Sequence, residues 1–219
     1  MPGASVRGVL FDLDGTLIDS APDLAGAANR LRADHGLPAL PLAQLRPMVG
    51  SGARGMVGVA FGVAPGDDRF ELLRDAFLAY YEAGLLERTH PFDGVEEMLA
   101  ALESAGLPWG IVTNKAARYT DALVPQIGLQ QAGCVISGDT TPHPKPHPAP
   151  LLEAARRLGL ASQDCWYVGD DLRDIQAGQA AGMRTVAAAW GYCGQTEPLS
   201  WGADALAESP LHLVNFLPA

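Results

Sequence analysis

The sequence predicts an α/β fold in which a doubly wound parallel sheet carries an inserted helical cap. Five short apolar runs are typical of buried strands, and they lie near residues 6–12, 108–113, 133–137, 165–169 and 184–188. A helical pattern precedes each of the last four runs, at 94–105, 116–127, 148–158 and 172–181, and a glycine follows each pattern. Strands and helices that alternate in this way build a Rossmann-like sheet with helices on both faces.

The stretch from about 20 to 86 breaks this alternation. Its apolar residues recur at helical spacing, as in Leu72-Leu73, Phe77 and Tyr80-Tyr81, and it contains no clear strand. Turn sequences at 20–22 and 88–91 bracket it. We therefore expect a helical cap at 20–86, inserted into an α/β core made of 1–19 and 87–219.

Size and composition narrow the class of protein. A chain of 219 residues with 48% hydrophobic and 18% charged residues has an ordinary globular composition. The net charge of −10 argues against a nucleic-acid partner, which needs a cationic surface. Three scattered cysteines fit neither a disulfide framework nor a zinc site. No run is long enough to span a membrane and no apolar leader precedes Asp12, so we expect a cytoplasmic protein; its oligomeric state stays open.

The first apolar run ends in a cluster of polar residues. Asp12-Leu13-Asp14-Gly15-Thr16 directly follows Val9-Leu10-Phe11. Two carboxylates so close repel each other unless a cation joins them or one holds a proton. Hard divalent cations prefer oxygen ligands of this kind. Gly15 permits a sharp turn, so the segment predicts a strand that ends at a polar site.

The chain contains only two lysines against thirteen arginines. Lys115 ends the segment Ile111-Val112-Thr113-Asn114-Lys115, and Lys145 lies in His143-Pro144-Lys145-Pro146. Lysine supplies a compact, mobile point charge that the planar guanidinium of arginine does not replace. The scarcity therefore indicates two functional lysines, with Lys145 the stronger candidate. The alternative for each is a solvated surface charge.

A further apolar run ends in Gly169-Asp170-Asp171-Leu172-Arg173-Asp174. Asp170 and Asp174 are four residues apart and share one face if a helix begins here. Asp171 competes with Asp170 as a metal ligand, whereas helix capping is the alternative role for Asp171 and Asp174. Asp12, Thr113 and Asp170 each follow a strand-like run. Ligands of open parallel sheets bind outside the carboxyl ends of the strands, so we expect these residues to meet.

Together these four segments resemble the four motifs of the haloacid dehalogenase superfamily. The family patterns are DxDGT, a strand that ends in Thr or Ser, KPxP, and GDxxxD, and they occur here in the family order across nearly the whole chain. The resemblance implies an enzyme, a Mg²⁺-dependent phosphatase acting on a small phosphate ester. Asp12 is then the nucleophile and Asp14 the general acid and base.

The same resemblance implies the remaining site residues. Mg²⁺ is expected on Asp12, Asp170 and the backbone carbonyl of Asp14. Thr113, Asn114 and Lys145 are expected to bind phosphate, with Asp171 and Asp174 as supporting acids. An alternative from a different class is a binding or regulatory protein that kept the fold without turnover, against which the intact set of carboxylates argues.

Sibling activities can be compared on the same residues. Haloacid dehalogenases lack the second aspartate, and phosphonoacetaldehyde hydrolases and β-phosphoglucomutases rely on a cap lysine, which 20–86 does not contain. Thr113-Asn114-Lys115 and Val49-Gly50-Ser51-Gly52 resemble the phosphoglycolate phosphatases. The segments 169–174, 190–192 and 201–204 resemble the N-acetylmuramic acid 6-phosphate phosphatases. The substrate stays open between these two groups.

One cap segment matches a cofactor pattern letter for letter. Gly50-Ser51-Gly52-Ala53-Arg54-Gly55 reads as GxGxxG, but Pro47 spoils the preceding strand that a dinucleotide site needs, so we reject a dinucleotide. We interpret Gly50, Ser51 and Gly52 as a loop over the active site, with Arg54 facing an anionic group of the substrate. A flexible loop without such a role is the alternative. The aromatic residues Trp190, Tyr192 and Trp201 are interpreted as packing residues.

Overall fold

A six-stranded parallel sheet forms the centre of the computed structural model, which describes residues 6–194 and 196–216. The strand order is β5-β4-β1-β6-β7-β8, and every neighbouring pair is parallel. The strands are β1 (Gly8–Phe11), β4 (Trp109–Val112), β5 (Val135–Ile136), β6 (Cys165–Gly169), β7 (Arg184–Ala188) and β8 (Ala205–Ala207). The predicted doubly wound sheet is confirmed. The ends of the predicted core ranges, 1–5 and 217–219, and residue 195 lie outside the described residues.

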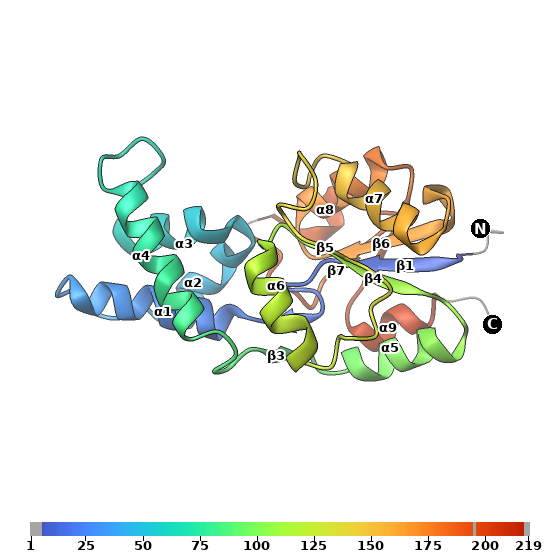
Figure 1. Ribbon diagram of the computed structural model, residues 1–219, viewed down its shortest axis with the longest axis horizontal. Coiled ribbons are helices and arrows are strands. Elements are labelled where there is room, and N and C mark those ends of the chain that lie inside the picture. The colour runs from blue at the N-terminus through green and yellow to red at the C-terminus, as the bar shows by residue number, and fades with distance from the viewer. Residues whose placement is uncertain (1–5, 195, 217–219) are drawn as a thin grey trace.

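Helices cover both faces of the sheet (Figure 1). On one face lie α7 (Ala149–Leu158) and α8 (Leu172–Ala180), and on the other α5 (Val95–Ser104) and α9 (Pro210–Val214). Side chains alternate along β1, so Val9 and Phe11 belong to the apolar cluster of α5 and α9, whereas Leu10 joins that of α7 and α8. Both clusters are fully buried around β1, which fixes the central strand and the residues that follow it.

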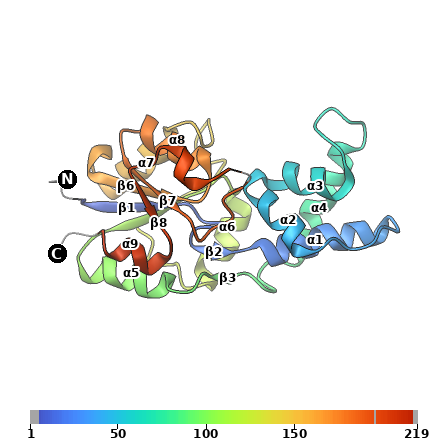
Figure 2. The same cartoon turned by 180° about the vertical axis from the view of Figure 1, so that it is seen from behind.

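A second group of helices lies beyond the carboxyl ends of the strands (Figures 1 and 2). It consists of α1 (Ala21–Asp34), α2 (Leu42–Leu45), the 3-10 turn η1 (Arg46–Ser51), α3 (Gly52–Phe61) and α4 (Phe70–Ala83), and no strand occurs between 20 and 86. These elements form the helical unit, residues 21–83. Its buried residues, such as Met56 and Phe77, continue the apolar cluster of the α5 face.

A short antiparallel ribbon joins the helical unit to the sheet. Strand β2 (Ile18–Asp19) leads into α1, and β3 (His90–Pro91) leads back toward α5, with Ile18 paired to Pro91. The chain therefore enters and leaves the helical unit at one place. The remaining described elements are α6 (Ala117–Leu123) and the 3-10 turns η2 (Val124–Gln126), η3 (Ser162–Asp164) and η4 (Pro198–Trp201).

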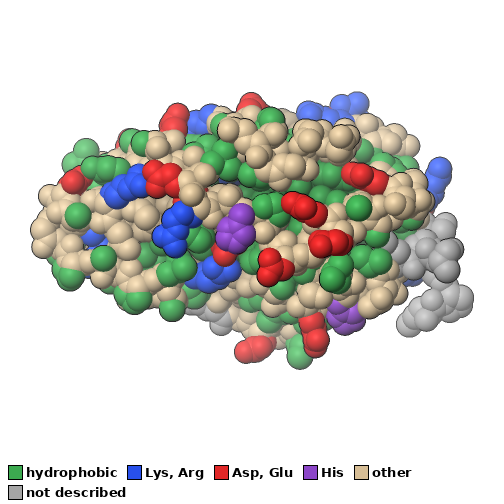
Figure 3. Space-filling view, turned by 90° about the horizontal axis from the view of Figure 1, so that it is seen from below, with side chains coloured by type: hydrophobic (Ala, Val, Ile, Leu, Met, Phe, Trp, Pro, Cys, Tyr) green, Lys and Arg blue, Asp and Glu red, His purple; other side chains and the backbone are tan. Residues whose placement is uncertain are grey.

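One face of the molecule carries most of its acidic side chains on the sheet-bearing half (Figure 3). Seen from below, acidic side chains are spread over the part of the face that holds α5 and α9 (Figure 3). The net charge is −10. An anionic ligand therefore needs cations inside its own site to overcome repulsion from this surface. None of the helices in the described ranges combines the length and the hydrophobicity that crossing a membrane demands.

Candidate active site

A cavity of about 270 Å³ lies between the carboxyl ends of the strands and the helical unit. The residues that follow β1, β4 and β6 line one side of it, and residues of η1, α3 and α4 line the other. Sheet residues in the lining include Asp12, Asp14, Thr113, Asn114, Lys145, Asp170, Asp171 and Asp174. The sheet thus brings the predicted residues of all four motifs to one cavity, as the crossover topology requires.

Asp12 is buried at the end of the central strand. Its backbone N–H donates to the carbonyl of Val168 on the neighbouring strand at 2.9 Å, which fixes its position. Burial raises the pKa of Asp12; Lys145 opposes that shift, Asp174 adds to it, and the result is a pKa of about 7. A further cation beside Asp12 would therefore stabilise its ionised form.

Lys145 is the cation at the centre of the site, and its side chain is 3% exposed. Its Nζ lies 2.8 Å from Asp12 Oδ1 and 2.7 Å from Asp174 Oδ1. The Asp12 contact is an ion pair without hydrogen-bond geometry, so Asp12 Oδ1 has no hydrogen-bond partner among the described residues. Nζ also donates to the Val112 carbonyl at 3.0 Å and to the Tyr167 hydroxyl at 2.8 Å. Burial disfavours the charged amine, but Asp12 and Asp174 outweigh it and raise the pKa of Lys145.

Asn114 holds the loop that carries this lysine. Its Oδ1 accepts from the Lys145 backbone N–H at 2.9 Å, and its Nδ2 donates to the Lys145 carbonyl at 2.9 Å. Thr113 is buried beside it, and the Thr113 hydroxyl accepts from the backbone N–H of Lys115 at 3.1 Å. The predicted phosphate-binding residues are therefore neighbours, with the Asn114 amide engaged by the Lys145 backbone.

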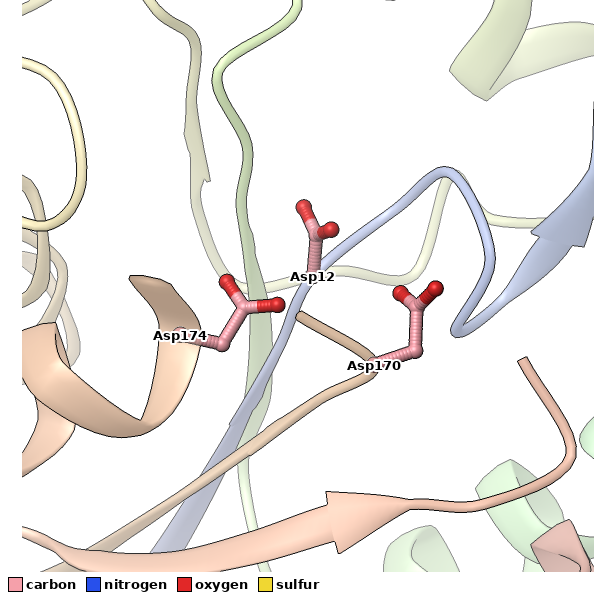
Figure 4. A group of neighbouring side chains, drawn as sticks. All are labelled: Asp12, Asp170 and Asp174. Carbon is pink, nitrogen blue, oxygen red and sulfur yellow. The ribbon is translucent and has the colours of Figure 1, made fainter. Parts of the chain in front are cut away.

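Two further carboxylates complete a buried acidic cluster. Asp12, Asp170 and Asp174 project side by side into the same space from the ends of β1 and β6 and the start of α8 (Figure 4). Their nearest oxygen atoms all lie within 4.8 Å of one another. Asp170 accepts from the Thr16 hydroxyl at 2.9 Å and from the Tyr192 backbone N–H at 2.9 Å, and no cationic side chain pairs with it among the described residues. Burial, followed by repulsion from Asp12 and Asp174, raises the pKa of Asp170 well above its usual range.

Asp171 and Asp174 make different contacts at the start of α8. Asp171 caps the helix by accepting from the Arg173 backbone N–H at 2.9 Å, and the Arg173 guanidinium pairs with it at 2.8 Å. Burial acts to raise the pKa of Asp171, but the hydrogen bonds from Arg173 outweigh burial, and the pKa of Asp171 is lowered. Asp174 accepts from the Asp171 N–H at 3.0 Å through one oxygen and contacts Lys145 through the other.

The cluster has the composition of a divalent-cation site. Lys145 pairs with Asp12 and Asp174 but not with Asp170, so the cluster of three carboxylates carries an excess of buried negative charge. Hard oxygen donors of this kind suit Mg²⁺. Gly15 brings the turn after β1 against Asp170: its φ is +92°, and a Cβ added there would lie 2.2 Å from Asp170 Oδ2. The residues present therefore fit a magnesium ion.

Asp14 lies on the helical-unit side of the cluster. Its Oδ1 accepts from the Ser20 hydroxyl at 2.5 Å and from Lys115 Nζ at 2.9 Å. The Lys115 side chain is 8% exposed and lies over the ring of Tyr81 at 4.7 Å from its centroid. Both lysines are thus buried ion-pair partners, and their interpretation as solvated surface charges is wrong.

Only some residues of the predicted specificity loop line the cavity. Gly50 and Gly52 line the cavity, and the Gly50 carbonyl accepts from the Arg173 guanidinium of α8. Ser51 lines a separate, smaller hollow. Arg54 is exposed on α3 and is not among the residues that line the cavity. The GxGxxG letters follow no strand, in agreement with the rejection of a dinucleotide.

The aromatic segment after β7 contributes more than the packing that the sequence predicted. Trp190 Nε1 donates to the Thr16 carbonyl at 2.9 Å, and the Tyr192 N–H donates to Asp170. The Tyr192 hydroxyl accepts from the Ser20 backbone N–H at 2.8 Å. A Cβ on Gly191 would lie 2.3 Å from Asp170 Cβ, so only glycine fits between. The sequence signal that could have indicated this role is a glycine, Gly191, between two aromatic residues just after a strand.

A buried aspartate cluster with one lysine at the carboxyl end of a parallel sheet defines a class of hydrolase. The family model described as "Haloacid dehalogenase-like hydrolase" matches residues 9–188, and the chain belongs to this family. The family resemblance predicted from the four motifs is confirmed.

Individual relatives agree with this assignment. The chain is 54% identical over 209 residues to a "Phosphoglycolate phosphatase" of Xanthomonas campestris pv. campestris, with 94% of each chain covered. It is 40% identical over 214 residues to an "N-acetylmuramic acid 6-phosphate phosphatase" of Pseudomonas aeruginosa, with 97% of this chain and 95% of the relative covered. The structure is also similar to the crystal structure of a "predicted phosphoglycolate phosphatase" from Haemophilus somnus, with a TM-score of 0.86 and 27% identity, and the match covers 97% of this chain and 98% of the other. The predicted enzyme class, a phosphatase, is confirmed by these relatives.

Proposed function

We propose that this protein is a Mg²⁺-dependent phosphomonoesterase that passes the phosphoryl group of a small phosphate ester to Asp12 and then to water. The observation that carries the proposal is the position of Asp12, buried at the end of the central strand between Lys145 and Asp170. A carboxylate held among a cation and metal-ligand oxygens is a nucleophile directed at an anionic phosphorus centre.

The magnesium site is assigned to Asp12, Asp170 and the backbone carbonyl of Asp14. Asp174 takes a supporting role, because one of its oxygens accepts from the Asp171 N–H and the other contacts Lys145. Asp171 is the helix cap, and its charge is matched by Arg173. When bound, Mg²⁺ neutralises and orients the phosphoryl oxygens.

The chemistry takes two displacements at phosphorus. An oxygen of Asp12 forms a bond to phosphorus as the bond to the ester oxygen breaks, and Asp14 donates a proton to that leaving oxygen. Water then attacks the aspartyl-phosphate, Asp14 takes the proton of the water, and the bond between Asp12 and phosphorus breaks. The hydrogen bond from Ser20 and the ion pair with Lys115 hold the Asp14 carboxyl in one orientation for both steps.

Phosphate binding is assigned to Thr113 and Lys145, together with backbone N–H groups at the same sheet edge. Asn114 acts through Lys145, because its amide holds the Lys145 backbone from both sides. The buried lysine also offsets repulsion between Asp12 and the incoming phosphate.

The helical unit is assigned the role of a cap at about 20–86. Val49, Phe77 and Tyr81 give the cavity an apolar wall opposite the carboxylates. Such a wall excludes water and contacts the leaving group. The contact from Arg173 to the Gly50 carbonyl fastens the loop to α8 over the site. A cytoplasmic location stays a prediction from the sequence.

Phosphoglycolate is the first candidate substrate. It is the ester named for the 54% identical relative, and it carries a carboxylate beside the phosphate. N-Acetylmuramic acid 6-phosphate is the second candidate, because the relative named for it matches 97% of this chain at 40% identity.

A phosphate-release screen tests the proposal. The panel contains phosphoglycolate, N-acetylmuramic acid 6-phosphate, simple sugar phosphates and an aryl phosphate, each with Mg²⁺ and with EDTA. We expect release that requires Mg²⁺, with the highest kcat/KM on one of the two carboxylate-bearing esters. Binding of esters without release from any of them would favour the non-catalytic alternative.

A further inference from the structure

The cavity holds a second polar subsite that the proposed phosphoryl transfer does not need. It adjoins Asp14 and is formed by Lys115 with Tyr81 of α4. Tyr119 closes it, with its ring 5.3 Å from that of Tyr81 in an edge-to-face arrangement. These three residues, Lys115, Tyr81 and Tyr119, are the Lys115 subsite, and all of them line the cavity.

Lys115 has donor capacity to spare in this subsite. An ammonium carries three N–H donors. The hydrogen bonds from Nζ both go to the Asp14 carboxylate, at 2.9 and 3.1 Å. A buried ammonium with a donor to spare beside a cavity is a receptor for an anion.

Tyr81 supplies an independent observation. The residue is 2% exposed, and its hydroxyl lies near the Lys115 ammonium but makes no hydrogen bond of good geometry among the described residues. Burial raises the pKa of this phenol to about 12, so it keeps its proton and can donate it in a hydrogen bond. Buried hydroxyls of folded proteins are normally paired, and an unpaired one in a cavity wall indicates a missing ligand.

We propose that Lys115 Nζ and the Tyr81 hydroxyl receive a carboxylate of the leaving group, one carbon away from the ester oxygen. This inference rests on the proposed phosphomonoesterase function. Asp14 has to reach the ester oxygen to protonate it, and Lys115 Nζ lies 2.9 Å from Asp14 Oδ1. A carboxylate next to the ester carbon therefore falls within reach of Lys115, whereas one attached across a sugar ring does not.

Other cations near the cavity are less suited to this role. The Arg173 guanidinium is engaged by Asp171 and by the Gly50 carbonyl. Arg118 stacks on Tyr119 at 4.5 Å, and its side chain is 55% exposed at the rim. Arg54 is exposed on the helical unit and does not line the cavity. Among the described residues of the cavity wall, Lys115 is thus the buried cation that remains besides Lys145, which the proposed function assigns to the phosphoryl group.

The test compares phosphoglycolate with its carboxamide analogue, which keeps the shape and removes the charge. The readout is the ratio of kcat/KM for the two esters, because any disturbance of Asp14 acts on both and cancels. Lys115→Met should reduce this ratio at least about 30-fold. Tyr81→Phe should reduce it about 10-fold, mainly through KM for phosphoglycolate. Lys115→Arg should restore part of the preference, and Arg54→Met, which removes an exposed charge, should leave it unchanged.

Each result separates this inference from the proposed function. Wild-type protein that releases phosphate from no ester would overturn the proposed function itself. Equal losses on both esters in Lys115→Met, with the ratio unchanged, would show that Lys115 only positions Asp14 and would overturn the subsite. A larger change of the ratio in Arg54→Met than in Lys115→Met would show that Arg54, and not Lys115, binds the carboxylate, and would overturn the subsite.

Discussion

Lys145 shows how one side chain can serve several groups at once. Its Nζ lies against Asp12, Asp174, the Val112 carbonyl and the Tyr167 hydroxyl, all within 3.0 Å. A planar guanidinium spreads its donors in a fork and does not fit four partners around one point. These four contacts are the physical reason that lysine rather than arginine stands at position 145.

We predict that Lys145→Ala lowers kcat/KM on an aryl phosphate at least about 100-fold, and that Lys145→Arg is nearly as severe. Steady-state kinetics with Mg²⁺ measure this, with circular dichroism to check folding. Arg157→Ala, which removes a cation paired with Glu153 on the surface of α7, is the control and should keep wild-type rates. Wild-type rates in Lys145→Arg would contradict the argument from lysine.

Asp170 and Asp174 are distinguished by their partners, and this difference predicts separate effects on Mg²⁺. Asp170 faces no cation among its hydrogen-bond partners, whereas both oxygens of Asp174 are occupied. Asp170→Asn should weaken Mg²⁺ binding more than Asp174→Asn. A loss of affinity of about 10–100-fold is typical when a residue that supports the metal ligands is changed, and we expect it for Asp174→Asn. Mg²⁺ titration by calorimetry measures both. A weaker affinity in Asp174→Asn than in Asp170→Asn would exchange the two assignments.

Among the elements, the loop after β7 acts most directly on Asp170, the proposed metal ligand. Gly191 lets the backbone pass between Asp170 and the Gly15 carbonyl, where a Cβ would lie 2.3 Å from each. The N–H of the following Tyr192 then reaches Asp170. The position of this loop therefore sets the orientation of the Asp170 carboxylate.

We predict that Gly191→Ala destabilises the protein by about 1–3 kcal/mol, because the added methyl group displaces the loop or Asp170. Its Mg²⁺ affinity should fall as well, by about tenfold or more. Denaturant unfolding and Mg²⁺ titration are the measurements. Gly26→Ala is the matched control: nothing lies within 4 Å of its added Cβ in α1, so it should be neutral or slightly stabilising. Unchanged Mg²⁺ affinity in Gly191→Ala would contradict the role of the loop.

The strands and the polar residues that end them could be predicted because these signals are local. Three of the five apolar runs and their carboxyl-end residues define where Asp12, Thr113 and Asp170 meet. Short elements such as β2, β3 and β8 left too few residues for a pattern. Contacts between distant segments were also outside sequence reasoning: Tyr192 and Ser20 are 172 positions apart.

The sequence also could not predict the direction in which single side chains point. The loop at Gly50 was expected over the site together with Arg54, and Gly50 lines the cavity while Arg54 is exposed. A sequence pattern gives the helix but does not fix how its first turn faces a neighbouring unit. Lys115 and Tyr81 meet only because α4 packs across the turn that follows β4.

For the whole molecule, the buried carboxylates link stability to pH and to Mg²⁺. The pKa of Asp12 is raised from 3.8 to about 7, and that of Asp170 is raised as well. A raised carboxyl pKa means that the native state binds the proton more tightly than the unfolded chain. Its contribution to stability is therefore present below pH 4 and is lost as the pH rises toward about 7.

We predict that the melting temperature in EDTA falls between pH 5 and pH 8, by about 2–4 °C for each kcal/mol lost. Mg²⁺ should raise the melting temperature more at pH 8 than at pH 5, because it replaces the lost protons. Differential scanning calorimetry at four pH values measures this, and Asp12→Asn should flatten the slope in EDTA. A melting temperature that rises over this range in EDTA would contradict the charge count of the cluster.

The covalent step through Asp12 is the central claim, and trapping the phosphorylated residue tests it most directly. In Asp14→Asn, an aryl phosphate still loses its good leaving group, but water lacks a base, so the intermediate should accumulate. Acid quenching, proteolysis and mass spectrometry should find one phosphate on Asp12. Asp12→Asn should carry none and should lose at least about a thousandfold in kcat. Turnover near the wild-type rate in Asp12→Asn, or phosphate on another side chain, would contradict the account.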